Sequence, residues 1–409
     1  MRAKPSIFFF LLVAATSLAQ TSATQPKIRA VTAFIQLDRS GYQVQINQTL
    51  VKLRQAKAAF EQAGYEVQSI RITTQPFPHY VRGLSKEQAL AFFRDYDALA
   101  RKENFAASIG PAMLAPADDS ASAELLAEIL SSTTGLDGSI VVAAEDGVRW
   151  NAVRAAARLT KYVEAHTTHS LGNFNFAASA MLPPHAPFYP GSYHDDGGGE
   201  FAVGMQSANV VAAAFASASD PTAAAKALEI ALGDHARKVE EIARQIEAQT
   251  AWKYMGLDLS PAPLKDVSIG AAIESLTHAR FGSSGTMTAV ATITSVLRSL
   301  PVQHAGYSGL MLPILEDSRL AQRWSEGKLS VDDMLAYSAV CGTGLDTIPL
   351  PGDASQEQLE KMIGDMATLA VKLHKPLSAR LLPVADKKPG DRTEFDDPFL
   401  VNATLQPLP

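Results

Sequence analysis

The sequence predicts a single large α/β domain closed into a β/α barrel. The chain has 409 residues, of which 47% are apolar and 19% charged, so it can bury a large core. Strand-like and helix-like segments alternate along the whole length without a break in composition. The strand candidates are numerous, and closing them into a barrel is easier than placing them all in one open sheet.

Residues 1–23 have the pattern of a secretory signal peptide. Arg2 and Lys4 give a positively charged start, and an apolar run follows at residues 7–19. This run is shorter than the roughly 20 residues that span a bilayer. We therefore expect the remaining domain, residues 24–409, to be exported to the periplasm or secreted, with no membrane contact after cleavage.

The first elements form a strand–helix–strand unit. Residues 28–37 are mostly apolar and partly β-branched, which is typical of a buried strand. Residues 46–64 place apolar side chains near one helical face, and Gly64 is a natural residue to end that helix. Residues 65–72 then predict the second strand.

The same alternation continues to the end of the chain. Ser85 and Gln88 form a capping box that starts a helix. Further strands are expected at residues 105–110, 139–144, 201–206, 254–260, 308–313 and 377–384. Further helices are expected at residues 120–130, 148–166, 220–250, 270–279, 285–300 and 356–374. This order indicates a parallel sheet, in which chemistry usually takes place in loops at the C-terminal ends of the strands.

Charge and cysteine content narrow the classes of partner. The net charge is -6 and no run of basic residues is present, so nucleic acid is not an expected partner. A single cysteine allows no intrachain disulfide. We expect a small-molecule ligand, and a homo-oligomer is left open.

Five segments carry more specific motifs, and together they lie between residues 256 and 391. They are GLDLSPAP at 256–263, FGSSGTMTAVATITSVL at 281–297, GYSGLMLPILED at 306–317, VCGTGLDTIPLPGD at 340–353 and LSARLLPVADKKPGD at 377–391. Their order and spacing resemble the DUF711 family, also called UPF0210. The strongest part of the likeness is Cys341, Gly344, Leu345, Asp346, Pro351, Gly352 and Asp353.

The resemblance implies a fold similar to the ten-stranded barrel of pyruvate formate-lyase, which belongs to the glycyl radical enzymes. By that likeness, Cys341 corresponds to the cysteine that those enzymes carry on a loop inside the barrel. The chain departs from them at its end, because residues 394–409 contain no glycine. No glycyl radical is therefore expected, and the resemblance implies no particular activity.

The candidate catalytic residues are Cys341, His194 and Asp346. Cys341 is followed by Gly342 and Gly344, which let the backbone approach a ligand closely, and it would act as a thiolate. The alternative is a small buried apolar residue. His194, in a glycine-rich loop, would act as general acid or base, and its alternative is an ordinary surface histidine.

Carboxylates beside glycine or proline are candidate ligand-binding residues. If they converged, they could bind Mg²⁺ or Ca²⁺, whereas their alternative role is helix capping and turn formation. No other cofactor is identified. The expected ligand-binding set is Asp258, Glu316, Asp353, Asn173, Gly342 and Gly344, and Asp317 and Asp346 belong to the same group of carboxylates.

Together these features favour an exported barrel enzyme that acts on a small polar organic molecule through Cys341. One alternative is a non-catalytic barrel that binds such a molecule. A second is a metal-dependent hydrolase that uses the carboxylates, although no HxH or HxxxH ligand pair is present.

Overall fold

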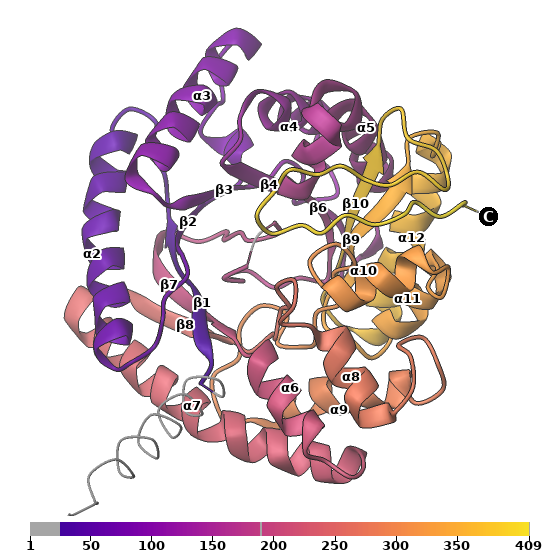
Figure 1. Cartoon of the computed structure of the whole chain (residues 1–409). Coiled ribbons are helices and arrows are strands. Elements are labelled where there is room, and N and C mark those ends of the chain that lie inside the picture. The colour runs from indigo at the N-terminus through magenta and orange to yellow at the C-terminus, as the bar shows by residue number, and fades with distance from the viewer. Residues whose placement is uncertain (1–24, 189, 409) are drawn as a thin grey trace, which may run out of the picture.

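The computed structural model describes residues 25–188 and 190–408. The signal peptide predicted at residues 1–23 lies outside these residues. The α/β class is confirmed. Within the described part of the chain, ten strands form one curved sheet around the centre of the molecule, and the helices surround it (Figure 1).

Parallel strands form the middle of the sheet, and an antiparallel pairing on each side leads to two more strands. The middle strands are β1 (Lys27–Ile35), β2 (Ile70–Thr74), β3 (Ala106–Pro111), β4 (Leu136–Ala144) and β6 (Phe176–Ala180). Beyond β1 lie β7 (Gly198–Gln206) and β8 (Lys253–Asp258), and beyond β6 lie β10 (Leu377–Val384) and β9 (Gly344–Pro351). Short β5 (Gly147–Val148) pairs with β4. The wholly parallel sheet that we expected is wrong at β1–β7 and at β6–β10.

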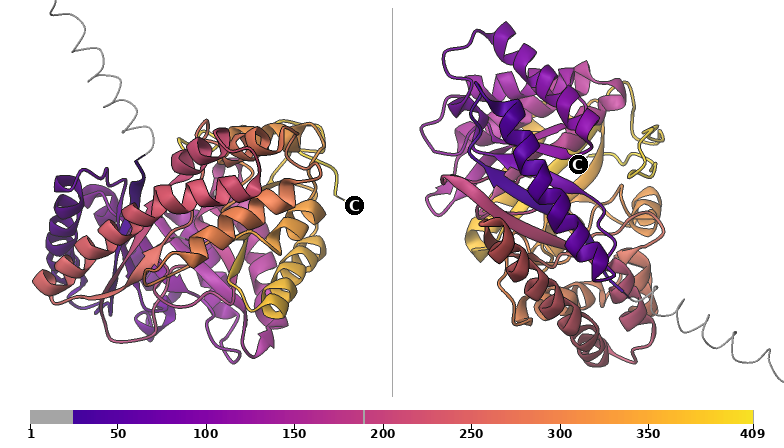
Figure 2. Two further views of the ribbon diagram at one scale, coloured as in Figure 1. Left: turned by 90° about the horizontal axis from the view of Figure 1, so that it is seen from below. Right: turned by 90° about the vertical axis from the view of Figure 1, so that its left-hand side faces the viewer.

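The helices pack their apolar faces against the outside of the sheet, and Figure 2 shows α7 running along the outside of the molecule. The predicted capping box of Ser85 and Gln88 is confirmed at the start of α3. No helix in the described residues has the length and apolar character needed to cross a membrane. The α-helices are α2 (Tyr42–Gln62), α3 (Lys86–Glu103), α4 (Ala121–Ser132), α5 (Trp150–His166), α6 (Ala208–Ala216), α7 (Pro221–Thr250), α8 (Ile269–Thr277), α9 (Thr286–Ser299), α10 (Ser318–Ser325), α11 (Val331–Ser338) and α12 (Gln356–Leu373), and the 3-10 helices are η1 (Phe77–His79) and η2 (Thr168–Asn175).

The sheet is not closed by strand pairing, because β8 and β9 are its two edges. An irregular segment, residues 303–316, lies between these edges and hydrogen-bonds to both. The Leu257 amide donates to the Gln303 carbonyl at 2.8 Å on the β8 side. On the β9 side the Ile314 amide donates to the Asp346 carbonyl at 3.0 Å. We call residues 303–316 the bridging segment.

The strands expected from the sequence differ from the structure at two places near these edges. Residues 308–313 were expected to form a strand, but they bend within the bridging segment. No strand is expected from the sequence at residues 344–351, which contain two prolines, yet they form β9. An edge strand tolerates proline, since its missing amide is not needed on the open side.

Alternation along the strands separates a polar inner face from an apolar outer face. In β2, Ile72 belongs to the main hydrophobic core, whereas Arg71 lines an inner cavity. In β4, Ile140 belongs to the hydrophobic core and Asp137 lines the cavity. Because side chains on a strand alternate between faces, every second residue of these strands lies in the interior.

A loop fills part of this interior. We define the interior loop as residues 181–188 and 190–197, between β6 and β7. The Ser192 hydroxyl hydrogen-bonds to the Thr73 hydroxyl at 2.7 Å, and the Ser108 hydroxyl donates to the Ser192 carbonyl at 3.1 Å. Thr32 donates to the Pro187 carbonyl at 3.0 Å. The loop is therefore held against β1, β2 and β3 from inside.

The glycines beside Cys341 serve backbone packing. A Cβ atom on Gly342 would lie 2.4 Å from the carbonyl carbon of Gly309, and Gly344 has a φ of +95°. The Gly342 amide also donates to the Leu310 carbonyl at 2.7 Å. These contacts join the residues before β9 to the bridging segment, so the close approach that the sequence predicts is made by backbone.

We predict that Gly342→Ala lowers the free energy of unfolding by about 3 kcal/mol, because the new methyl group must push two backbones apart. Gly233→Ala is the matched control. Gly233 lies in α7 with only ordinary contacts of 3.6 Å or more, so alanine should raise stability by about 0.5–1 kcal/mol. Urea unfolding of both variants measures the two changes, and equal effects would contradict the packing role of Gly342.

Candidate functional site

An interior cavity of about 710 Å³ opens at the N-terminal ends of the parallel strands. Ser69, Phe105 and Gly135 line it, and each comes just before a strand. We expected the site at the opposite, C-terminal ends. That expectation is wrong for this cavity, because the interior loop packs inside β1, β2 and β3 and leaves the open space at their beginnings.

Among the charged side chains that line the cavity, basic ones outnumber acidic ones. Six arginine or lysine side chains and four aspartate or glutamate side chains line it, although the chain as a whole carries a net charge of -6. Two small recesses continue it inward. One shares Arg29 and Arg380 with the cavity, and the other shares Arg71 and Asp137. An interior with this balance of charge favours an anionic ligand.

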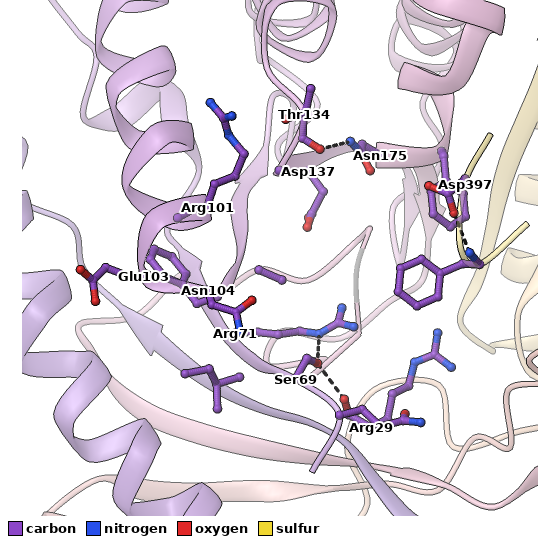
Figure 3. A pocket seen from close by; sticks show the side chains of 18 of the residues that line it. Arg29, Ser69, Arg71, Arg101, Glu103, Asn104, Thr134, Asp137, Asn175 and Asp397 are labelled. Carbon is purple, nitrogen blue, oxygen red and sulfur yellow. Dashed lines mark hydrogen bonds between the residues drawn. The ribbon is translucent and has the colours of Figure 1, made fainter. Parts of the chain in front are cut away.

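Arg71 projects from β2 into the cavity and is positioned by Ser69. Its Nε donates to the Ser69 hydroxyl at 3.1 Å, and that hydroxyl donates to the Arg29 carbonyl at 2.7 Å (Figure 3). The Arg29 guanidinium lies over the Phe188 ring, 4.9 Å from its centre. Two adjacent strands and the interior loop thus hold two cationic groups on one side of the cavity.

Arg380 brings a third guanidinium from β10. Its Nε donates to Asp346 Oδ1 at 2.8 Å, and its Nη2 forms ion pairs with both Asp346 and Glu316. All three side chains are buried. Burial raises the pKa of Glu316, and the charge of Arg380 offsets this only in part. Glu316 and Asp346 are therefore brought together, and their shared partner is an arginine.

Asp137, at the start of β4, is the most unusual group in the cavity. It is 2% exposed, and its Oδ1 has no hydrogen-bond partner among the described residues. Burial raises the pKa of Asp137 to about 8, while the Ser108 hydroxyl and the charges of Arg71 and Arg380 act in the opposite direction. In Figure 3 the carboxyl group points into the space that Arg71 faces from the other side. Asp137 is thus a buried acid that keeps its proton at neutral pH.

Sequence reasoning did not single out Asp137, Arg71, Arg29 or Arg380. One signal could have found them. Asp137 and Arg380 are each the lone charged residue of a strand that is mostly apolar. Arg71 is the lone charged residue of β2, and Arg29 is the charged residue in the interior of β1. A charge in such a strand must face something other than the hydrophobic core, and in a curved sheet that is the interior.

Cys341 lies in the hydrophobic core and is 0% exposed. It lines neither the cavity nor the two recesses beside it. Buried Lys375 donates hydrogen bonds to the carbonyls of Ser338 and Cys341, which anchors this loop at the end of α11. This placement corresponds to the alternative that the sequence left open, a small buried apolar residue.

His194 is fully buried, and both of its ring nitrogens have partners. Nε2 lies 2.8 Å from the Ile35 carbonyl oxygen, and Nδ1 lies 3.0 Å from Asp196 Oδ1. A carbonyl oxygen can only accept a hydrogen bond, so Nε2 carries a proton. The surface position that was its alternative is wrong, and neither nitrogen is directed at the cavity.

The remaining predicted residues do not converge. Asp258 accepts hydrogen bonds from the Ser260 amide and hydroxyl at 2.9 and 2.6 Å and from the Tyr307 amide at 2.8 Å. Asp317 caps α10, and Asp353 is exposed. Asn173 is buried in η2 and donates to the Thr160 carbonyl. The expected Mg²⁺ or Ca²⁺ site of gathered carboxylates is therefore not formed by these side chains.

Comparison with known proteins identifies the family. A family model described as "Uncharacterised ACR (DUF711)" matches residues 21–396. The chain belongs to the DUF711 family. This confirms the likeness seen in the motifs and adds no activity.

Three relatives are named UPF0210 proteins. That of Pyrobaculum aerophilum is 34% identical over 67% of this chain and 62% of its own length. That of Pyrobaculum arsenaticum is 33% identical over 66% of this chain and 61% of its own length. That of Pyrobaculum islandicum is 30% identical over 80% of this chain and 76% of its own length. The chain thus spans about three fifths of the length of the first two relatives.

We predict that Asp137→Asn becomes increasingly more stable than the wild type as pH rises from 4 to 8. The folded pKa of about 8 lies above the unfolded value near 4, so only the unfolded chain releases this proton in that window. The release favours unfolding, and asparagine removes it. The difference in free energy of unfolding should grow by at most about 1.4 kcal/mol per pH unit. Denaturant unfolding at several pH values measures it, and a constant difference would show that Asp137 is ionised throughout.

Proposed function

We infer that this DUF711 protein is an enzyme that binds a small organic anion in the interior cavity and transfers a proton to it from Asp137. The observation that carries the proposal is the buried carboxyl group of Asp137, which faces Arg71 across a cavity and whose Oδ1 has no hydrogen-bond partner among the described residues. The volume of about 710 Å³ falls in the range of small-molecule sites. The expectation of export stays a prediction.

The arginines support an anionic ligand. Guanidinium groups form paired, charge-assisted hydrogen bonds with carboxylates and phosphates, and they remain charged at every physiological pH. Arg29, Arg71 and Arg380 come from three different strands and surround one interior space. A small carboxylate or phosphate ester would therefore be held on several sides.

Asp137 supports chemistry in addition to binding. A carboxyl group with a pKa of about 8 is protonated at neutral pH and can act as general acid. The anchored charge of a bound anion would place its reacting atom near this proton. Cysteine chemistry is not part of the proposal, because Cys341 lies in the core.

We predict that some small carboxylates or phosphate esters raise the thermal unfolding midpoint of the full chain. Arg71→Gln should weaken binding at least about tenfold, because it removes a charged hydrogen-bond donor. Arg94→Gln, on the exposed face of α3, should leave binding unchanged. Equal affinity of both variants, or a panel without any ligand, would contradict the anion site.

We further predict that Asp137→Asn retains ligand binding but lowers turnover of that ligand by about 10²–10⁴-fold. Wild-type turnover should fall as pH rises through about 8, because the acid loses its proton. The measurement is product formation followed by NMR across the pH range. A ligand that binds equally to both proteins and is never converted would instead identify a non-catalytic binding barrel.

A further inference from the structure

A second group of polar side chains lies at the opposite end of the parallel strands. His185, His194 and Asp196 belong to the interior loop, and Glu200 belongs to β7. Glu200 pairs in register with Phe34 near the end of β1, and the His185 ring packs edge-on against Phe34 with 4.9 Å between ring centres. This group is separate from the set that lines the interior cavity.

Three of these side chains present ligand atoms to one another. One atom each from His185, Asp196 and Glu200 lie within 4.8 Å of one another. The His185 Nε2 and Asp196 Oδ2 atoms are 3.0 Å apart. Two ligands bound about 2.1 Å from one ion at angles of 90–109° would be separated by about 3.0–3.4 Å. The spacing therefore suits two ligands of a shared cation.

Buried polar atoms without hydrogen bonds point to the same ligand. His185 is 6% exposed, and its Nε2 forms no hydrogen bond despite its short distance to Asp196. Glu200 Oε2 is likewise buried without a hydrogen-bond partner. An unsatisfied buried nitrogen or oxygen destabilises the fold. A cation among these atoms would bind both.

His194 orients the carboxylate of this group. It contacts Asp196 Oδ1 at 3.0 Å and the Ile35 carbonyl at 2.8 Å, so its ring is fixed between the loop and the end of β1. Asp196 Oδ1 is thereby held, and Oδ2 is left facing His185. Partners that hold one oxygen of a ligating carboxylate in this way are usual around metal ions.

We propose that His185, Asp196 and Glu200 bind one divalent transition-metal ion of the Zn²⁺ type, with His194 as a positioning residue for Asp196. Imidazole nitrogen favours such ions over Ca²⁺ and Mg²⁺, which prefer oxygen ligands alone. The Asp196 side chain is 42% exposed, which gives the ion a path from solvent and leaves room for bound water. This site does not depend on the function proposed for the cavity.

The ion would also stabilise the boundary of the interior cavity. It joins the interior loop to β7, and the same loop supplies Phe188 and Ser192 to the small recesses beside the cavity. Metal binding should therefore reduce the motion of the loop without adding a group to the cavity. A metal-bound protein should resist proteolysis within the interior loop more than the metal-free protein.

The test is titration of the chelator-treated full chain with Zn²⁺ alone, followed by calorimetry and by metal analysis after dialysis. We expect one Zn²⁺ per chain, and no binding of Ca²⁺ or Mg²⁺ at the same concentrations. Glu200→Gln should weaken Zn²⁺ binding at least about tenfold, because it removes one ligand. His374→Asn is the matched control, since exposed His374 faces Glu145 at 3.7 Å, and its affinity should not change.

Co²⁺ gives a second readout that does not depend on how well a variant folds. In the wild type, Co²⁺ in a nitrogen- and oxygen-ligated protein site should show a visible spectrum distinct from that of the hydrated ion, and Zn²⁺ should abolish it. A wild-type spectrum identical to that of hydrated Co²⁺ would overturn the proposal. So would equal Zn²⁺ affinities of wild type and Glu200→Gln.

Discussion

The cavity depends on one buried interaction, the contact of the Arg380 guanidinium with Asp346 and Glu316. These residues come from β10, β9 and the bridging segment, so one cation joins two strands to the chain that lies between the sheet edges. A charge moved out of water without its partners costs several kcal/mol. The bridging segment must therefore approach β9 closely, and Gly309 and Gly342 let the two backbones do so.

The curvature of the sheet explains why the interior is polar. A curved sheet with helices outside has one face for the hydrophobic core and another that faces its own far side. Here the inner face carries Arg71 and Asp137, and the interior loop satisfies only part of its polar groups through Ser192. Asp137 Oδ1 is left without a partner at the cavity, and burial raises the pKa of this carboxyl group to about 8.

Local patterns in the sequence predict the longer helices, most strands and the family, because periodicity, the Ser85 capping box and the glycine-rich motifs are properties of neighbouring residues. They do not predict the short helices α6, α10 and α11. They could not place Cys341. Glycines beside a cysteine fit a ligand loop and tight backbone packing equally well, and the choice depends on Gly309, which is distant in sequence. The role of Asp137 likewise depends on strands that curve to face one another. His194 was expected to act as general acid or base, and the structure instead places its ring nitrogens against the Ile35 carbonyl and the Asp196 carboxylate.

The central claim is that Asp137 is a protonated acid inside a cationic cavity. The most direct measurement is the pH dependence of its carboxyl carbon shift in ¹³C-aspartate-labelled protein, with the resonance assigned by its absence from Asp137→Asn. The account predicts a titration near pH 8. A midpoint below about pH 5, in the usual range of aspartate, would contradict it.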